Sequence, residues 1–254
     1  HKSAFLILPS TKSKFLSMTT LHNKTTRCSV CGTEAEDTVI ASTNAFGSPD
    51  LDTRPPEMKR STIRLWVQRC YSCGNCASDL SQASACARDI IQTQEYTAQL
   101  KDSDFPELVN SFICKSIIDE NGKEWATAAW ALIHAAWACD DAKLSSQAIM
   151  CRRRAAAMLR KVATTDQKLV SQPGLATVIL IDLLRRAGEM DEAVTVIQEN
   201  RYNPSEGIMR QIIDYQMDLI NAKDLDCHTI AEAISKGSVP AQHRKAKRWW
   251  RFWI

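Results

Sequence analysis

Two pairs of cysteines are the residues best suited to chemistry in this chain. Cys28 and Cys31 stand two residues apart and are followed by a glycine, and Cys70 and Cys73 repeat this arrangement. Two thiolates at this spacing can face one metal ion, because the glycine lets the backbone turn tightly behind them. The two pairs together predict one tetrahedral Zn²⁺ site per chain. Such a site has no open position for water or substrate, so it indicates a structural metal and not a reaction.

A fifth cysteine, Cys76, lies close to the second pair. The four predicted ligands already fill the tetrahedral shell of zinc, so a buried apolar role or a spare thiol is favoured over coordination by Cys76. The other five of the ten cysteines are scattered through sequence of helical character. This distribution favours a reducing compartment over a disulfide framework.

A second group of polar residues lies in the turn-rich segment between the cysteine pairs. Asp50, Asp52 and Arg54 stand among the glycine and prolines of this segment. Two carboxylates beside a guanidinium could bind a cation or a phosphate group. The alternative, which we favour, is that these side chains cap turns and pair with one another.

Two short runs flank this polar segment and have the β-branched and aromatic bias of strands. They span residues 38–43 and 63–69, and the second places Ile63, Leu65 and Val67 on one face. We expect the two runs to form the sheet between the cysteine pairs. The cysteines and this sheet predict a small zinc-ribbon-like head over residues 27–79, preceded by a leader or disordered segment over residues 1–26.

After residue 79 the composition changes to alanine, leucine, isoleucine and glutamine with few glycines, which predicts helices. The predicted helices span residues 82–93, 106–119, 124–139, 144–162, 167–187, 191–199 and 205–221. The helix at 124–139 carries Trp125, Trp130 and Trp137 around most of its circumference, so we expect it at the centre of the core. His134 on this helix has no acidic, cysteine or serine partner at helical spacing, so we interpret it as a core histidine with a hydrogen-bond partner.

Residues 180–199 read as a helix that ends at Gly188, a tight turn and a second helix. This unit is similar to the inter-helix turn of a tetratricopeptide repeat, although the spacing of such units in the chain is irregular. The predicted fold is therefore mainly α: a small β zinc-ribbon head followed by a tetratricopeptide-like helical array over residues 80–235.

The C-terminal segment, residues 236–254, interleaves basic and aromatic side chains and contains no acidic residue. Its candidate contact residues are Arg244, Lys245, Lys247, Arg248, Trp249, Trp250, Arg251 and Trp253. Lysine and arginine are attracted to anionic lipid and tryptophan favours the membrane interface, so we expect an attachment segment for an anionic membrane surface. The alternatives are that the aromatic residues fold back onto the helical array, or that they contact nucleic acid or a protein. No apolar run is long enough to predict a transmembrane segment.

The cysteine pairs, the polar segment at residues 42–57 and the helices that follow resemble a family of bacterial proteins of unknown function. In that family a zinc-ribbon-like head precedes a tetratricopeptide-like body. The resemblance covers residues 27–221 and departs from the family at Asn75 and Cys76, where the family usually has other residues. It implies metal binding and a bacterial cytoplasmic setting, and it implies no activity.

Three functions follow from these patterns. The first is a non-enzymatic zinc-binding adaptor whose helical surface binds a protein or peptide partner. The second is a zinc-ribbon nucleic-acid-binding protein, although the chain without its basic C-terminal segment is slightly acidic. The third is a metal-dependent hydrolase that uses the carboxylates between the cysteine pairs. The sequence contains no phosphate loop and no two-histidine zinc motif that would support this function. We expect a cytoplasmic protein, with peripheral attachment to the inner face of the membrane through the C-terminal segment.

Overall fold

The structure, a computed structural model, describes residues 19–82, 84–200 and 207–237. In these residues the fold is mainly α with a small β head, as predicted. The strands are β1 (Thr20–Arg27), β2 (Glu34–Ser42), β3 (Gln68–Arg69) and β4 (Cys76–Ala77). The helices are α1 (Glu57–Arg60), the 3₁₀ turn Ile63–Leu65, α2 (Ala87–Ile90), α3 (Gln94–Leu100), α4 (Glu107–Asn121), α5 (Trp125–Asp141), α6 (Ser145–Ala163), α7 (Leu175–Arg186), α8 (Met190–Glu199), α9 (Ile208–Asn221) and α10 (Ile230–Gly237).

The head consists of two antiparallel hairpins, and each hairpin has one cysteine pair at its tip. β1 pairs with β2 so that Arg27 faces Glu34, and β3 pairs with β4 so that Arg69 faces Cys76. The two hairpins form separate two-stranded sheets. The predicted pairing of residues 38–43 with 63–69 is therefore wrong, because each strand pairs across its own cysteine turn. The expectation of a leader or disorder is also wrong for residues 20–26, which belong to β1.

The first three residues of the predicted strand at residues 63–69 form a helical turn. Leu65 donates its backbone N–H to the carbonyl of Thr62, and the indole Nε1 of Trp66 donates to the hydroxyl of Thr62 across 2.9 Å. These bonds close the 3₁₀ turn Ile63–Leu65, and the strand is reduced to Gln68–Arg69. The alternation of apolar residues in this run therefore came from a turn that buries Ile63 and Val67.

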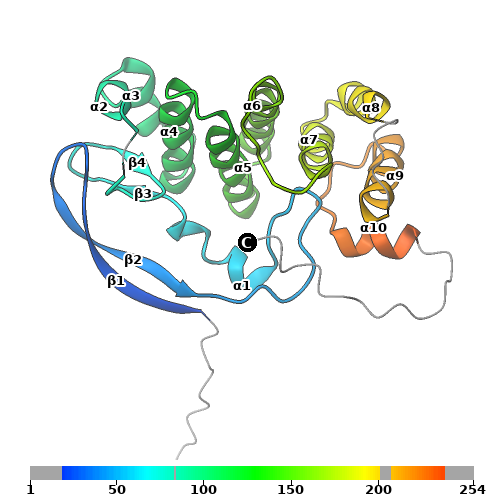
Figure 1. The fold of residues 1–254 in the computed structure, drawn as a ribbon, viewed down its shortest axis with the longest axis horizontal. Coiled ribbons are helices and arrows are strands. Elements are labelled where there is room, and N and C mark those ends of the chain that lie inside the picture. The colour runs from blue at the N-terminus through cyan, green and yellow to red at the C-terminus, as the bar shows by residue number, and fades with distance from the viewer. Residues whose placement is uncertain (1–18, 83, 201–206, 238–254) are drawn as a thin grey trace, which may run out of the picture.

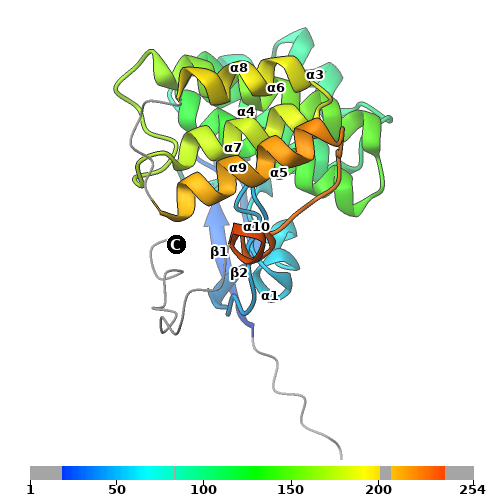
Figure 2. The ribbon, with the colours of Figure 1, turned by 90° about the vertical axis from the view of Figure 1, so that its right-hand side faces the viewer.

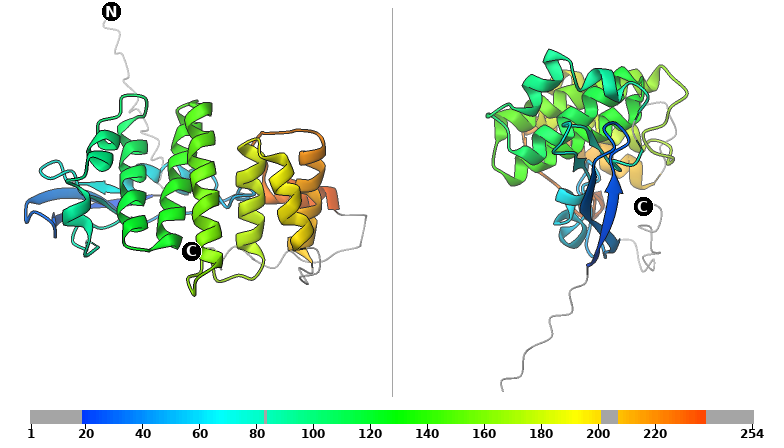
Figure 3. Two further views of the ribbon diagram at one scale, coloured as in Figure 1. Left: turned by 90° about the horizontal axis from the view of Figure 1, so that it is seen from above. Right: turned by 90° about the vertical axis from the view of Figure 1, so that its left-hand side faces the viewer.

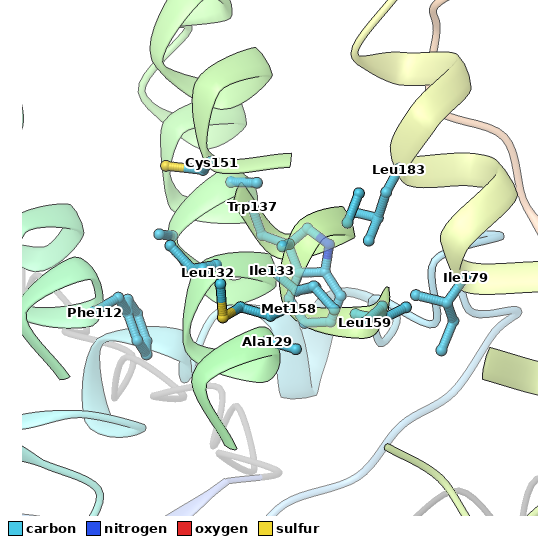
Figure 4. Close-up of a cluster of buried hydrophobic side chains, with 14 of the residues drawn as sticks. Phe112, Ala129, Leu132, Ile133, Trp137, Cys151, Met158, Leu159, Ile179 and Leu183 are labelled. Atoms are coloured by element: carbon cyan, nitrogen blue, oxygen red, sulfur yellow. The ribbon is translucent and has the colours of Figure 1, made fainter. Parts of the chain in front are cut away.

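Helices α4 to α9 stand side by side in a row, and α5 packs extensively against both α4 and α6 (Figure 1). Nearly every side of α5 is buried, and Trp137 is only 2% exposed. Figure 4 shows this core, in which side chains of α5, α6 and α7 meet around Trp137. The prediction that this helix is central is confirmed.

Two of the predicted helices need correction, and two further helices after residue 79 were missed. Only a short helix, α2, forms within residues 82–93. The helix predicted at 167–187 begins at Leu175, because Gly174 adopts a left-handed conformation with φ 79° directly before it. Helices α3 and α10 were not predicted, since both are too short for a clear hydrophobic period.

Four helices of the row end in the same turn. The residue two positions beyond the helix end has a positive φ, and the next residue donates its N–H to a carbonyl five positions back. The left-handed residues are Lys123 (φ 60°), Lys143 (φ 59°), Gly188 (φ 80°) and Lys223 (φ 53°). This bonding satisfies carbonyls that a helix end leaves open. The repeated element in this chain is thus a turn geometry, and only one of the four turns has a glycine at its left-handed position.

The molecule has two layers (Figures 2 and 3). The row of helices forms one layer, and the β1–β2 hairpin, α1 and α10 lie on one side of it. Between β2 and α1, residues 44–56 form an irregular segment, which we call the crossing loop. It reaches along the helical row as far as the start of α10, where Asp50 forms an antiparallel bridge with Thr229 (Figure 1). No helix in the described part of the chain has the length and apolar character needed to cross a bilayer.

Candidate metal centre

The four predicted ligands come together. The Sγ atoms of Cys28, Cys31, Cys70 and Cys73 all lie within 4.8 Å of one another. The Sγ atoms of Cys28 and Cys73 are 3.8 Å apart, and those of Cys31 and Cys70 are 3.6 Å apart. Four sulfurs at about 2.3 Å from a zinc ion, at the corners of a tetrahedron, lie about 3.8 Å from one another. The spacing of the thiols therefore fits a tetrahedral thiolate site, and this group could hold a metal ion.

The two cysteine turns share one backbone geometry. In the first, Gly32 has φ 78° and donates its N–H to the carbonyl of Cys28 across 2.7 Å. In the second, Gly74 has φ 80° and donates to the carbonyl of Cys70 across 2.7 Å. A Cβ atom at Gly74 would lie 2.7 Å from a methyl carbon of Leu100, so side chains are excluded there by space as well as by conformation.

Helix α3, which the sequence did not predict, closes the second turn. The side chain of Tyr96 is fully buried, and its hydroxyl donates to the carbonyl of Gly74 across 2.7 Å. Thr93 caps the helix by accepting the backbone N–H of Tyr96. A capping threonine before a helix was the one sequence signal that could have located this support.

The first turn is held by different partners. Ser29 donates its backbone N–H to the carbonyl of Leu80 across 2.9 Å. The guanidinium of Arg88 donates to the carbonyl of Val30 across 2.6 Å. The first turn is thus anchored to the segment after β4 and to α2, which brings the two hairpins together at their tips.

The thiols of the cluster have unequal acidity. Hydrogen bonding to Thr33 lowers the pKa of Cys31 to about 6, whereas burial raises the pKa of Cys70 and of Cys73. Metal binding to the cluster must therefore release protons from the buried thiols, which makes it dependent on pH. Cys76 is not part of the cluster; its thiol is buried and lies 3.5 Å from the carbonyl oxygen of Gly74.

Asp52 of the crossing loop is fully buried against the helical row. Its Oδ2 accepts a hydrogen bond from the indole Nε1 of Trp137 across 2.7 Å, and it lies 3.5 Å from a guanidinium nitrogen of Arg186. Arg186 also contacts Asp140, and Asp140 contacts the buried Arg152. The carboxylate of Asp52 thus belongs to a buried ionic network that joins the loop to α5, α6 and α7.

The other two residues of the predicted polar group are also paired. Asp50 accepts a hydrogen bond from Arg60 of α1 across 2.6 Å, and Arg54 contacts Asp141 of α5 at 2.5 Å. Burial raises the pKa of the Asp50 carboxyl. The three side chains do not converge on one space. We expected these residues to cap turns and to pair with one another. Asp52 does accept the backbone N–H of Arg54 across 3.3 Å, but the ion-pair partners of all three side chains lie outside the trio.

His134 lies within an aromatic cluster, and it is half-buried. The rings of Trp66, Phe112, Trp130 and Trp137 have their centres 5.0–5.7 Å from its ring. Burial lowers the pKa of His134 to about 3, so the ring is neutral at physiological pH. The hydrogen-bond partner that we expected is not found among the described residues. The ring is held by aromatic packing, and nothing beside it suggests acid–base chemistry.

The candidate contact residues of the C-terminal segment, from Arg244 to Trp253, lie outside the described residues. Comparison of the chain with protein-family models, with curated proteins and with solved structures finds no match.

Proposed function

We propose that this chain is a non-enzymatic zinc-binding protein whose helical array binds a protein or peptide partner. The observation that supports the proposal is the closed ligand set: four cysteine sulfurs at the spacing of a thiolate tetrahedron, with no place for a substrate. Residues Cys28, Cys31, Cys70 and Cys73 would hold one Zn²⁺. The ion would supply folding energy to the two hairpins, because the strands of the first are mostly exposed and those of the second have only two residues each.

The hydrolase interpretation loses its main support. Its candidate residues were the carboxylates of the crossing loop, and both are neutralised by arginine in the structure. A carboxylate that acts on a metal or a water needs a free oxygen facing an accessible space. Asp50 is 4% exposed and Asp52 is fully buried, so neither offers one.

The crossing loop also limits where a partner can bind. It covers the face of the array formed by α5 and α7, through Asp52 and Arg54. We therefore place the partner on another surface: a side of the helical row that the loop leaves open, or the junction of the head with α4.

Nucleic-acid binding is the second candidate, and one feature favours it. A pocket of about 640 Å³ beside the first cysteine turn is lined by Arg27 and Arg88, both exposed. Guanidinium groups of this kind suit phosphate contacts. Filter binding to single-stranded DNA and RNA at increasing salt tests it. Affinity that falls steeply with salt, and is lost in Arg27→Ala/Arg88→Ala protein that still holds its metal, would replace the adaptor proposal.

The cellular setting is part of the proposal. The family resemblance of the sequence supports a bacterial cytoplasm, and the basic and aromatic C-terminal segment supports peripheral attachment to an anionic membrane. Co-sedimentation with anionic vesicles tests the attachment. We expect binding that weakens with salt and disappears when residues 241–254 are removed. Equal sedimentation of the full and shortened chains would contradict it.

The adaptor function is tested by reconstitution. Tagged full-length protein is used to isolate partners from its native host, and each candidate is purified and mixed with zinc-loaded protein. We expect a complex of fixed stoichiometry by analytical ultracentrifugation. The control is protein in which Cys28→Ser has removed the metal. Absence of any complex that survives purification would contradict the proposal.

A further inference from the structure

The four thiols of the candidate metal centre differ in their access to solvent. Cys31 is exposed, Cys73 is half-buried, and Cys28 and Cys70 are only 2% and 6% exposed. The thiol group of Cys31 itself lies at the surface, where its Sγ is 3.3 Å from the hydroxyl of Thr33. A small reagent that approaches the centre from solvent therefore meets the sulfur of Cys31 first.

Cys31 also lines the pocket of about 640 Å³ beside the first cysteine turn. Two guanidinium groups are fixed on either side of it. Arg88 donates to the carbonyl of Val30 across 2.6 Å, and Nε of Arg27 donates to the carbonyl of Gly32 across 3.2 Å. Val30 and Gly32 are the chain neighbours of Cys31, and no acidic residue lines the pocket. Reactive cysteines in proteins lie in partly exposed, electropositive surroundings of this kind.

A second thiol lies within reach of Cys31. The Sγ of Cys70, which belongs to the other cysteine turn, is 3.6 Å away. Since a disulfide bond is about 2.05 Å long, the two sulfurs need to approach by only about 1.5 Å to form one. Cysteines that sense oxidants are accessible and are often placed next to a resolving cysteine, which captures the oxidised sulfur. Cys31 and Cys70 have this arrangement.

We propose that Cys31 is a site of reversible oxidation by a peroxide, with Cys70 as its resolving thiol. This inference uses the proposed metal ligands and does not depend on the adaptor role. A cysteine that coordinates a metal ion is deprotonated, and the thiolate is the form that reacts with a peroxide. The modification would give a regulatory property to a centre that is otherwise structural.

The reaction has two steps. The sulfur of Cys31 attacks one oxygen of hydrogen peroxide and the O–O bond breaks, which leaves a sulfenic acid on Cys31 and, with one proton from solvent, one water. The sulfur of Cys70 then attacks the sulfur of Cys31, and the S–O bond breaks. The hydroxyl leaves with a second proton as water. The two sulfurs together lose two electrons and the peroxide gains them. Only Cys28 and Cys73 remain as ligands, so the metal should be released.

The test uses full-length, zinc-loaded protein treated with hydrogen peroxide at neutral pH. A chromogenic chelator follows zinc release, and dimedone, which adds to sulfenic acids, marks the first cysteine that is oxidised. We expect dimedone on Cys31. Without dimedone, we expect one zinc released for each disulfide formed, and peptide mapping by mass spectrometry should find Cys31 joined to Cys70. A dithiol reductant with added Zn²⁺ should restore the metal.

The matched control is Cys227→Ser. Cys227 is also exposed but lies outside the cluster, so its removal should leave the rate of zinc release unchanged. In the wild-type protein, oxidation of Cys227 shows that the peroxide is active.

Three results would overturn the inference. The first is dimedone on Cys28, Cys70 or Cys73 before it appears on Cys31. The second is a first disulfide within one turn, between Cys28 and Cys31 or between Cys70 and Cys73. The third is zinc that stays bound after Cys227 has been oxidised. The failures of the proposals can be separated. Protein purified without zinc would contradict the metal assignment, and its dimedone and disulfide patterns would still decide the oxidation of Cys31. Failure to reconstitute a partner would contradict the adaptor role alone.

Discussion

Asp52 and Trp137 lie 85 positions apart in the chain, yet the indole Nε1 of Trp137 donates to the carboxylate of Asp52 across 2.7 Å. Both side chains are almost completely buried. The bond joins the crossing loop to the central helix α5, and Arg186 supplies the opposite charge. A buried carboxylate with a fixed donor and a cation is stable only while its partners remain in place.

Replacing Asp52 should therefore destabilise the protein strongly. Asp52→Ala leaves the cation of Arg186 less compensated and the indole N–H unpaired, so we expect a loss of about 3–5 kcal/mol in the free energy of unfolding. Asp52→Asn keeps an acceptor for the indole and should cost less. Asp214→Ala, which removes the exposed pair with Arg210, is the control and should cost about 0–1 kcal/mol. Urea unfolding measures all three, and equal losses for Asp52→Ala and Asp214→Ala would contradict the buried network.

Metal removal should unfold the head. Protein prepared without chelator should contain about one zinc per chain, and Cys28→Ser or Cys70→Ser should lose the metal, because metal binding at such a site supplies folding energy on the order of 10 kcal/mol. Elemental analysis and amide hydrogen exchange of β1 to β4 measure the two effects. Cys227→Ser, outside the cluster, should keep the metal. Less than about 0.3 zinc per chain with reduced thiols would contradict the assignment.

His134 should make stability depend on pH. Its pKa is lowered by burial from 6.5 to about 3, so the unfolded chain binds a proton that the folded chain rejects between these values. The stability of the folded protein therefore carries no penalty from His134 above about pH 6.5. As the pH falls from there toward 3, the free energy of unfolding decreases by up to about 1.4 kcal/mol per pH unit. His134→Phe should flatten this part of the profile, measured by urea unfolding at pH 4 to 7. His22→Gln, at an exposed strand residue, should leave the slope unchanged.

In the four similar turns, adding and removing a glycine should change the free energy of unfolding in opposite directions. Gly188→Ala meets no atom within 4 Å, so its cost arises only from a left-handed backbone and should be about 1 kcal/mol. Lys143→Gly relieves the same strain and should stabilise by up to about 1 kcal/mol, less the entropy that glycine adds to the unfolded chain. Thermal and urea unfolding give both values. A stabilising Gly188→Ala would show that this turn does not have the described geometry.

The cysteine pairs and α5 could be predicted because their signals are local. A Cys-x-x-Cys-Gly turn is defined by five consecutive residues. The apolar residues around α5 can be recognised from the sequence of that one helix. The pairing of the strands could not, because strands as short as Gln68–Arg69 carry no register signal and are held by the turn between them. The burial of the crossing loop could also not be predicted from the sequence. Asp50, Asp52 and Arg54 have polar types typical of the surface, and their partners lie up to 134 positions away.

Stacks of helix pairs are usually extensible, because each pair contacts only its neighbours and the stack can lengthen or unfold from one end. The crossing loop removes that freedom here. It contacts α5 and α7 through Asp52, and through Ser48 and Pro49 it bonds to Ala231 and Ile230 of α10. The span from α5 to α10 cannot grow until these bonds break. These bonds therefore fix the distance between the central helix α5 and α10, and the helical array acts as a rigid spacer.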